Sequence, residues 1–134
     1  PKAGDVLRPL RTTIRLLNAG LDPRTSCGVA PQGVSPSFTT SLPGASSPFV
    51  NLTWAASADD GTGQNDVDRY VIYRRPDTAA VFTLPYSSIP AGLSSYTFTD
   101  NAVSHGEGWI YGVAAQDCTP STSSVGTTST IVVP

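Results

Sequence analysis

Three short stretches in which apolar and polar side chains alternate constrain the fold of this chain more than any other feature. Within residues 50–54 every second side chain is apolar, which is the period of a strand with one buried face. Residues 70–74 and 109–115 carry similar runs. The side chains expected to share a core are Val50, Leu52, Trp54, Tyr70, Ile72, Trp109, Tyr111, Val113 and Ala115. The pattern therefore predicts a mainly β protein, built as an antiparallel β-sandwich.

Turn-forming residues divide the rest of this region into further short strands. We expect strands within 36–42 and 125–133, at 49–56, 69–75, 95–99 and 109–116, and a weaker one near 80–84. Pro85 and Pro90 predict a sheet edge that resists further pairing, because proline cannot donate a main-chain hydrogen bond. Seven short strands at this spacing favour a sandwich.

Ahead of the sandwich, residues 5–19 predict one short amphipathic α-helix, in which Pro9 would introduce a kink or a later start. Its apolar stripe is Leu7, Leu10, Ile14 and Leu17, and Arg8, Arg11 and Arg15 lie on the neighbouring face. Because so short a helix is marginal in water, we expect it to dock on a partner or on its own sandwich. The predicted division is 1–35, helix and Gly/Pro linker, and 36–134, sandwich.

The two cysteines, Cys27 and Cys118, lie far apart in the sequence and match no metal-ligand spacing. The simplest interpretation is one disulfide that ties the N-terminal segment to a late loop, and the alternative is two separate buried thiols. A disulfide indicates an oxidising compartment, so we expect the protein to be extracellular or at the cell surface.

Residues 48–134 resemble a bacterial fibronectin type III domain. The similarity is carried by VNLTW at 50–54, NDVDRYVIYR at 65–74, SYTFTD at 95–100 and WIYGVAA at 109–115. Trp109 departs from the tyrosine that is usual at the start of that last strand, and an indole cannot copy the corner hydrogen bond of a phenol. The resemblance implies a fibronectin type III or immunoglobulin-like sandwich that serves as a spacer or interaction module, without catalytic residues of its own.

Residues 15–23, RLLNAGLDP, resemble the end of the long first helix of type IV minor pilins and pseudopilins. In that family the upstream half of the helix is apolar, spans the membrane and later forms the filament core. The resemblance implies that the partners are other protein subunits, including those of a homo-oligomeric filament. Membrane contact would then need a segment that is absent from this chain.

Candidate catalytic residues are few. His105, Glu107 and Lys2 are each the sole residue of their kind, so nucleophile–base pairs and paired glutamates have no clear candidate. We therefore expect no enzyme activity, no catalytic residue and no required cofactor. Three helical arginines without interleaved aromatic residues argue against nucleic acid as a partner.

One loop offers a candidate metal site. Its carboxylate and amide oxygens could hold Ca²⁺, although their spacing differs from an EF-hand, and turn formation with solvation is the alternative. The candidate calcium ligands are Asp59, Asp60, Asn65, Asp66 and Asp68.

These observations favour a non-catalytic subunit of an extracellular surface assembly, namely a pilin-like protein with a fibronectin type III-like head. The alternative is an accessory spacer, or a carbohydrate- or protein-binding module, of a secreted enzyme or adhesin. Tyr73 and Tyr86 are aromatic residues that could stack on sugars in the second case.

Overall fold

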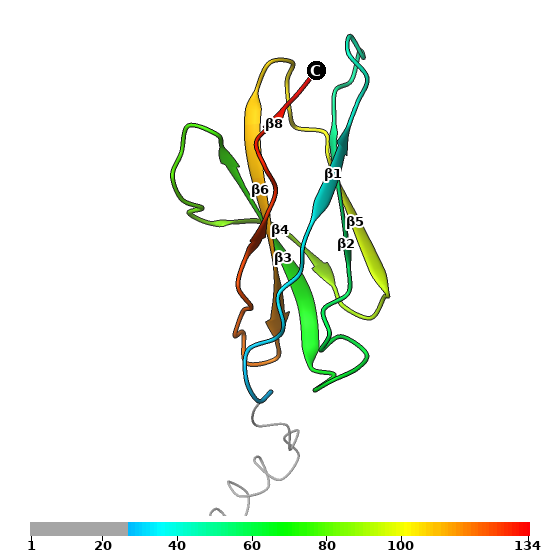
Figure 1. The fold of residues 1–134 in the computed structure, drawn as a ribbon, viewed down its shortest axis with the longest axis vertical. Helices are drawn as coiled ribbons and strands as arrows, with labels where there is room; N and C mark the ends of the chain where they lie inside the picture. The colour runs from blue at the N-terminus through cyan, green and yellow to red at the C-terminus, as the bar shows by residue number, and fades with distance from the viewer. Residues whose placement is uncertain (1–26) are drawn as a thin grey trace, which may run out of the picture.

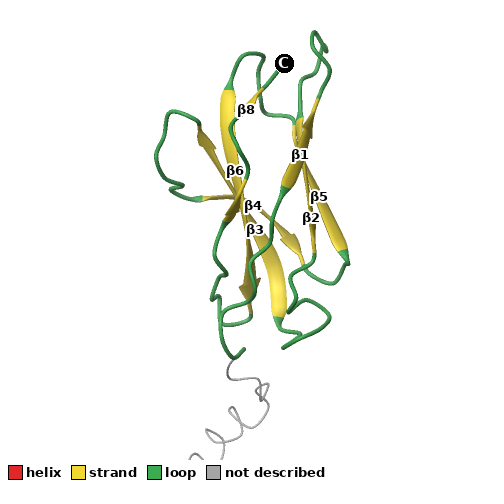
Figure 2. Ribbon diagram, in the orientation of Figure 1, coloured by secondary structure: helices red, strands yellow, loops and turns green. Residues whose placement is uncertain are grey.

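The computed structural model describes residues 27–134, and these form two β-sheets packed face to face (Figures 1 and 2). The strands are β1 (Ser37–Thr40), β2 (Val50–Ala55), β3 (Val67–Pro76), β4 (Pro85–Pro90), β5 (Ser95–Asp100), β6 (Gly108–Asp117), β7 (Gly126–Thr127) and β8 (Ile131–Val132). The part of the chain that the structure describes contains no helix that could cross a membrane. The predicted helix at 5–19 lies outside the described residues.

All strand pairs are antiparallel, as the sequence predicted. One sheet has the order β1-β2-β5, and the other has the order β4-β3-β6-β7, with β8 also paired to β6. The long strands β3 and β6 form the centre of the second sheet, where Tyr70 faces Ala115 and Ile72 faces Val113. The antiparallel β-sandwich is therefore confirmed.

The core lies between the sheets. Of the side chains predicted to share it, these belong to it: Val50, Leu52, Trp54, Tyr70, Ile72, Tyr111, Val113 and Ala115. Trp54, Tyr70 and Tyr96 make an aromatic cluster, with ring centroids 4.4 to 5.9 Å apart. The other core residues are Val34, Val50, Leu52, Ile72, Val103, Tyr111, Val113, Ala115, Ile131 and Val133. Val34 precedes the first strand, so part of the segment predicted as a linker also packs into the sandwich.

Three predictions were wrong in detail: the strand at 80–84, the single strand within 125–133, and the full burial of Trp109 in the core. Residues 80–84 form no strand; they belong to the loop between β3 and β4, from which Phe82 packs against Tyr73 of β3 (Figure 1). The edge strand is β4 itself, which begins and ends with proline. A proline is tolerated there because an edge strand needs hydrogen bonds on only one side. The last strand is split into β7 and β8, and Trp109 lies half-buried at the rim of the core.

Candidate functional site

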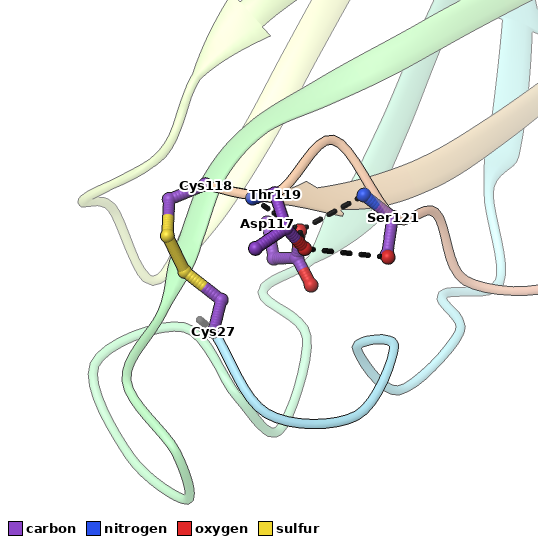
Figure 3. Close-up of a disulfide and its surroundings, with 5 residues drawn as sticks. All are labelled: Cys27, Asp117, Cys118, Thr119 and Ser121. Carbon is purple, nitrogen blue, oxygen red and sulfur yellow. Dashed lines mark hydrogen bonds between the residues drawn. A yellow bond between two sulfur atoms is a disulfide. The ribbon is translucent and has the colours of Figure 1, made fainter. Parts of the chain in front are cut away.

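A disulfide joins the start of the described chain to the turn after β6 (Figure 3). Cys27 and Cys118 have their Cα atoms 5.9 Å apart, and they are separated by 91 positions in the sequence. The predicted pairing is thus present. Because residues 28–117 lie between the two cysteines, the bond closes most of the sandwich into one covalent loop.

Asp117, the last residue of β6, organises the turn beside this disulfide (Figure 3). Its Oδ1 accepts hydrogen bonds from the main-chain nitrogen of Thr119 at 2.8 Å, from the Thr119 hydroxyl at 2.7 Å and from the main-chain nitrogen of Ser121 at 2.9 Å. Burial alone would raise the pKa of Asp117, but these hydrogen bonds hold the pKa below its ordinary value. Its Oδ2 is buried and has no hydrogen-bond partner among the described residues.

The aspartate-rich loop is held by its own hydrogen bonds, and these occupy most of the predicted calcium ligands. Asp59 accepts from the main-chain nitrogens of Gln32 at 2.9 Å and Gln64 at 3.3 Å. Asn65 has a positive φ and accepts from the main-chain nitrogen of Gly61 at 3.0 Å. Asp68 forms an exposed ion pair with Arg69 at 3.0 Å.

Asp60 connects this loop to the aromatic core. Its Oδ2 accepts hydrogen bonds from the hydroxyls of Tyr70, at 2.8 Å, and Tyr96, which come from β3 and β5 in different sheets. Burial raises the pKa of both phenols, and the bonds to Asp60 raise it further. Asp60 therefore acts as a link between the sheets.

Asp66 is the predicted ligand that remains available. Its Oδ1 is buried without a hydrogen-bond partner in the described part of the chain. Burial is the largest cause that raises its pKa, followed by the negative charges of Asp117 and Asp59. Within residues 27–134 no group of three or more His, Cys, Asp or Glu residues is placed to hold a metal ion. The predicted carboxylate ligands Asp59, Asp60, Asp66 and Asp68 thus do not form such a group.

A second buried network lies where β5 ends, and the sequence analysis missed it. The Arg74 guanidinium donates to Asp100 Oδ2 at 2.7 Å, and its central carbon lies 4.2 Å from the ring centroids of both Tyr86 and Trp109. The Tyr111 hydroxyl also donates to Asp100 Oδ2, at 2.7 Å. Oδ1 accepts from the Tyr86 hydroxyl at 3.0 Å and from the main-chain nitrogen of residue 102 at 2.8 Å.

Through these contacts Asp100, the last residue of β5, joins its own sheet to the sheet that contains β3, β4 and β6. Burial alone would raise its pKa, but the hydrogen bonds from Tyr111, from main chain and from Arg74 together lower it. Burial tends to lower the pKa of Arg74, and its bond to Asp100 outweighs this and raises the pKa. The Tyr111 hydroxyl thus donates to a carboxylate of the other sheet, whereas the Trp109 indole donates to Glu107 at 3.0 Å.

The outer faces of both sheets carry shallow depressions. One, of about 340 Å³, lies on the β3–β4 side and is lined by Arg69, Val71, Tyr73, Pro85, Tyr86, Ser87, Ser88 and Gln116. Tyr73 and Tyr86 both line it, although the Tyr86 ring also packs against the Arg74 guanidinium. The other, of about 410 Å³, lies on the β1–β2–β5 sheet and is lined by Ser35, Ser37, Thr53, Trp54, Ala55, Ser95, Tyr96 and Thr97.

The ring nitrogens of His105 lie against the main-chain oxygens of Ala45 and Pro134, in a turn.

The predicted partner-facing residues of the helix lie outside the described part of the chain. They are Leu7, Leu10, Ile14, Leu17, Arg8, Arg11 and Arg15. No statement about their contacts follows from the structure.

Comparison with known proteins relates the chain to others through its fold. The sequence matches no family profile and no curated relative. The twitchin kinase region from C. elegans (Fn31-NL-kin-CRD-Ig26) is similar in structure, with a TM-score of 0.57 and 16% identity over 79% of this chain. The match covers 17% of the twitchin chain, so the present chain spans about one sixth of that structure's length.

A Fn3-like protein from Clostridium thermocellum is also similar, with a TM-score of 0.45 and 21% identity over 74% of this chain and 92% of its own. At such identities the likeness concerns the fold alone. The strand order, the core and the twitchin match agree, and together they show that the described chain has a fibronectin type III-like fold.

Proposed function

We propose that this chain is a non-catalytic structural module of an extracellular surface assembly. Its disulfide is consistent with an oxidising compartment, and modules with its fold commonly serve as structural or interaction units. The carboxylates of Asp59, Asp60 and Asp100 are engaged in bonds that join separate segments, which supports a structural role for them.

The observation that carries this proposal is the position of the disulfide relative to the two ends of the described chain. The described chain begins at one end of the sandwich, and its C-terminus lies at the other (Figure 1). Tension along this axis would enter at Cys27, cross to Cys118 and continue through residues 119–134 alone. Strands β1 to β6 lie inside the covalent loop and are thereby protected from being pulled apart.

Force spectroscopy on the full chain, held at both ends, tests this arrangement. With the disulfide intact, the segment from Cys118 to Pro134 can lengthen to roughly 55 Å. After reduction, the chain from Cys27 to Pro134 can lengthen to roughly 360 Å. A long extension of the unreduced protein would show that the sandwich is not shielded from load, and it would remove the main support for the proposal.

The finer proposal is a pilin-like subunit that docks into a filament of other subunits through residues 1–26. It rests on the resemblance of residues 15–23 and on the apolar stripe. The full-length protein should then co-sediment with filaments sheared from the cell surface, and Leu10→Asp should abolish this. Leu42→Asp, at an exposed position of the sandwich, is the matched control and should leave it unchanged.

A binding module of a secreted enzyme or adhesin is the second candidate, and the depression beside Tyr73 and Tyr86 favours it. Affinity electrophoresis in gels that contain soluble polysaccharides would then show retardation. Tyr73→Ala should remove that retardation, because it deletes an aromatic surface on which a sugar ring could stack. Mobility that is equal in all gels would leave the filament proposal as the better one.

A further inference from the structure

Two buried carboxylate oxygens that lack hydrogen-bond partners lie in neighbouring segments beside the disulfide. They are Oδ1 of Asp66 and Oδ2 of Asp117. Asp117 is opposite Val67 in the pairing of β3 with β6, and Asp66 directly precedes Val67. The two side chains therefore come from the same end of adjacent strands.

The negative charge at this point is not balanced by a basic group in the described chain. Asp117 is 2% exposed, and its other oxygen, Oδ1, already accepts hydrogen bonds from Thr119 and Ser121. Asp59 adds a third carboxylate nearby, but both of its oxygens accept main-chain hydrogen bonds. The adjacent Arg69 is directed to Asp68 at the surface. A buried carboxylate without a partner is unfavourable unless it takes up a proton or meets a positive charge, so a cation would be stabilised at this point.

We propose that Ca²⁺ binds between the carboxylates of Asp66 and Asp117, at the disulfide end of the sandwich. Calcium accepts six to eight oxygen ligands, which include carboxylates, main-chain carbonyls and water. Since the described residues place no third free carboxylate or histidine at this point, carbonyl oxygens and water complete the shell. These two ligands differ from the five predicted from the sequence, because Asp66 lies in the loop before β3 whereas Asp117 is the last residue of β6.

Two carboxylates imply weak binding, with a dissociation constant on the order of 10⁻³ M, as in other extracellular calcium modules. The bound ion would connect the loop before β3 to the turn that carries Cys118. It would thus reinforce the same end of the sandwich that the disulfide closes.

Calorimetric titration and thermal unfolding of the full chain at pH 7.5 test this site, with CaCl₂, MgCl₂ or EDTA at constant ionic strength. In 10 mM CaCl₂ the Tm should exceed that in EDTA by about 5 °C, as linkage predicts for a millimolar site in a domain of this size. The titration should give one site. Mg²⁺ should have a smaller effect, because it requires a stricter octahedral geometry.

Asp117→Asn is the sharpest variant, because its amide oxygen can still accept the bonds from Thr119 and Ser121. Asp117→Asn and Asp66→Asn should each abolish the calcium-dependent shift. Asp68→Asn is the matched control from the same loop and should keep the shift, because Asp68 is exposed and paired with Arg69.

Two outcomes would overturn the proposal. The first is a wild-type protein that gives no binding heat and the same Tm in CaCl₂ and EDTA, which would mean that a proton neutralises the pair. The second is a calcium-dependent shift that persists in both asparagine variants, which would place the ion elsewhere. The wild-type titration decides the first point even if a variant fails to fold.

Discussion

The replacement Asp100→Asn should destabilise the sandwich strongly, although it exchanges only one carboxylate oxygen for an amide nitrogen. Asp100 is 2% exposed and accepts bonds from Arg74, Tyr86, Tyr111 and main chain. An asparagine amide nitrogen at the Oδ2 position cannot accept the bonds from Arg74 and Tyr111. The guanidinium then loses its counter-charge and the Tyr111 hydroxyl loses its acceptor.

The magnitude follows from these two losses. A hydrogen bond to a charged group contributes about 1.5–3 kcal/mol, and an unsatisfied buried hydroxyl costs about 1–3 kcal/mol. Breaking a buried ion pair by removing one partner costs about 3–5 kcal/mol in other proteins, which agrees with this range. We expect the free energy of unfolding to fall by about 4 kcal/mol and the Tm to fall by roughly 15 °C.

Urea unfolding followed by tryptophan fluorescence and circular dichroism measures this change. Asp77→Asn, at an exposed loop position, is the control and should remain within about 0.5 kcal/mol of the wild type. The folded-state pKa of Asp100 lies below the ordinary 3.8. Its contribution to the free energy of unfolding is therefore complete above about pH 5 and is lost as the pH falls below 3.8 and through the folded-state pKa. The variant should lack this acid dependence. A loss below about 1 kcal/mol would refute the reasoning, because Arg74 and Tyr111 would then not depend on Asp100.

Two further changes test other parts of the fold. Replacing both Cys27 and Cys118 with alanine should lower the free energy of unfolding by about 4 kcal/mol in urea, because the disulfide closes a loop of 91 positions, and a loss under 1 kcal/mol would contradict the entropic argument. Gly126→Ala should lower the urea midpoint by an amount equivalent to about 2 kcal/mol, since its Cβ would fall on the carbonyl oxygen of Val34. Thr127→Ala, exposed on the same strand, should have little effect, and equal midpoints for the two variants would show that Val34 can move aside.

Sequence periodicity located the core well because one-sided burial leaves a period of two in every strand that faces it. Leu52, Tyr70 and Val113 are fully buried, as their positions in the alternating runs predicted. The strand expected at 80–84 is absent. Its apolar residues Val81 and Leu84 are largely exposed in the loop after β3, so one-sided burial does not act on them. A short apolar run does not by itself indicate burial.

The cysteine pair was also predictable, since two cysteines in a chain with this composition leave one possible disulfide. The candidate calcium ligands of the loop stay a prediction, and the structure shows other contacts for several of them. A cluster of aspartates in one loop suggested one metal site, yet Asp59, Asp60 and Asn65 serve as hydrogen-bond acceptors that shape the loop. Whether a carboxylate shapes a turn or binds a metal ion depends on which hydrogen-bond donors lie beside it, and the sequence does not show where those donors lie.

The sequence by itself determined the alternation that defines the strands, the aromatic core and the one possible disulfide of this protein. Only the tertiary structure placed Arg74 between two aromatic rings against Asp100, and only it brought Asp66 beside the strand that ends at Asp117. The physical reason is that burial of apolar groups follows a local period, whereas the partner of a buried charge comes from a distant segment and is set by the pairing of strands.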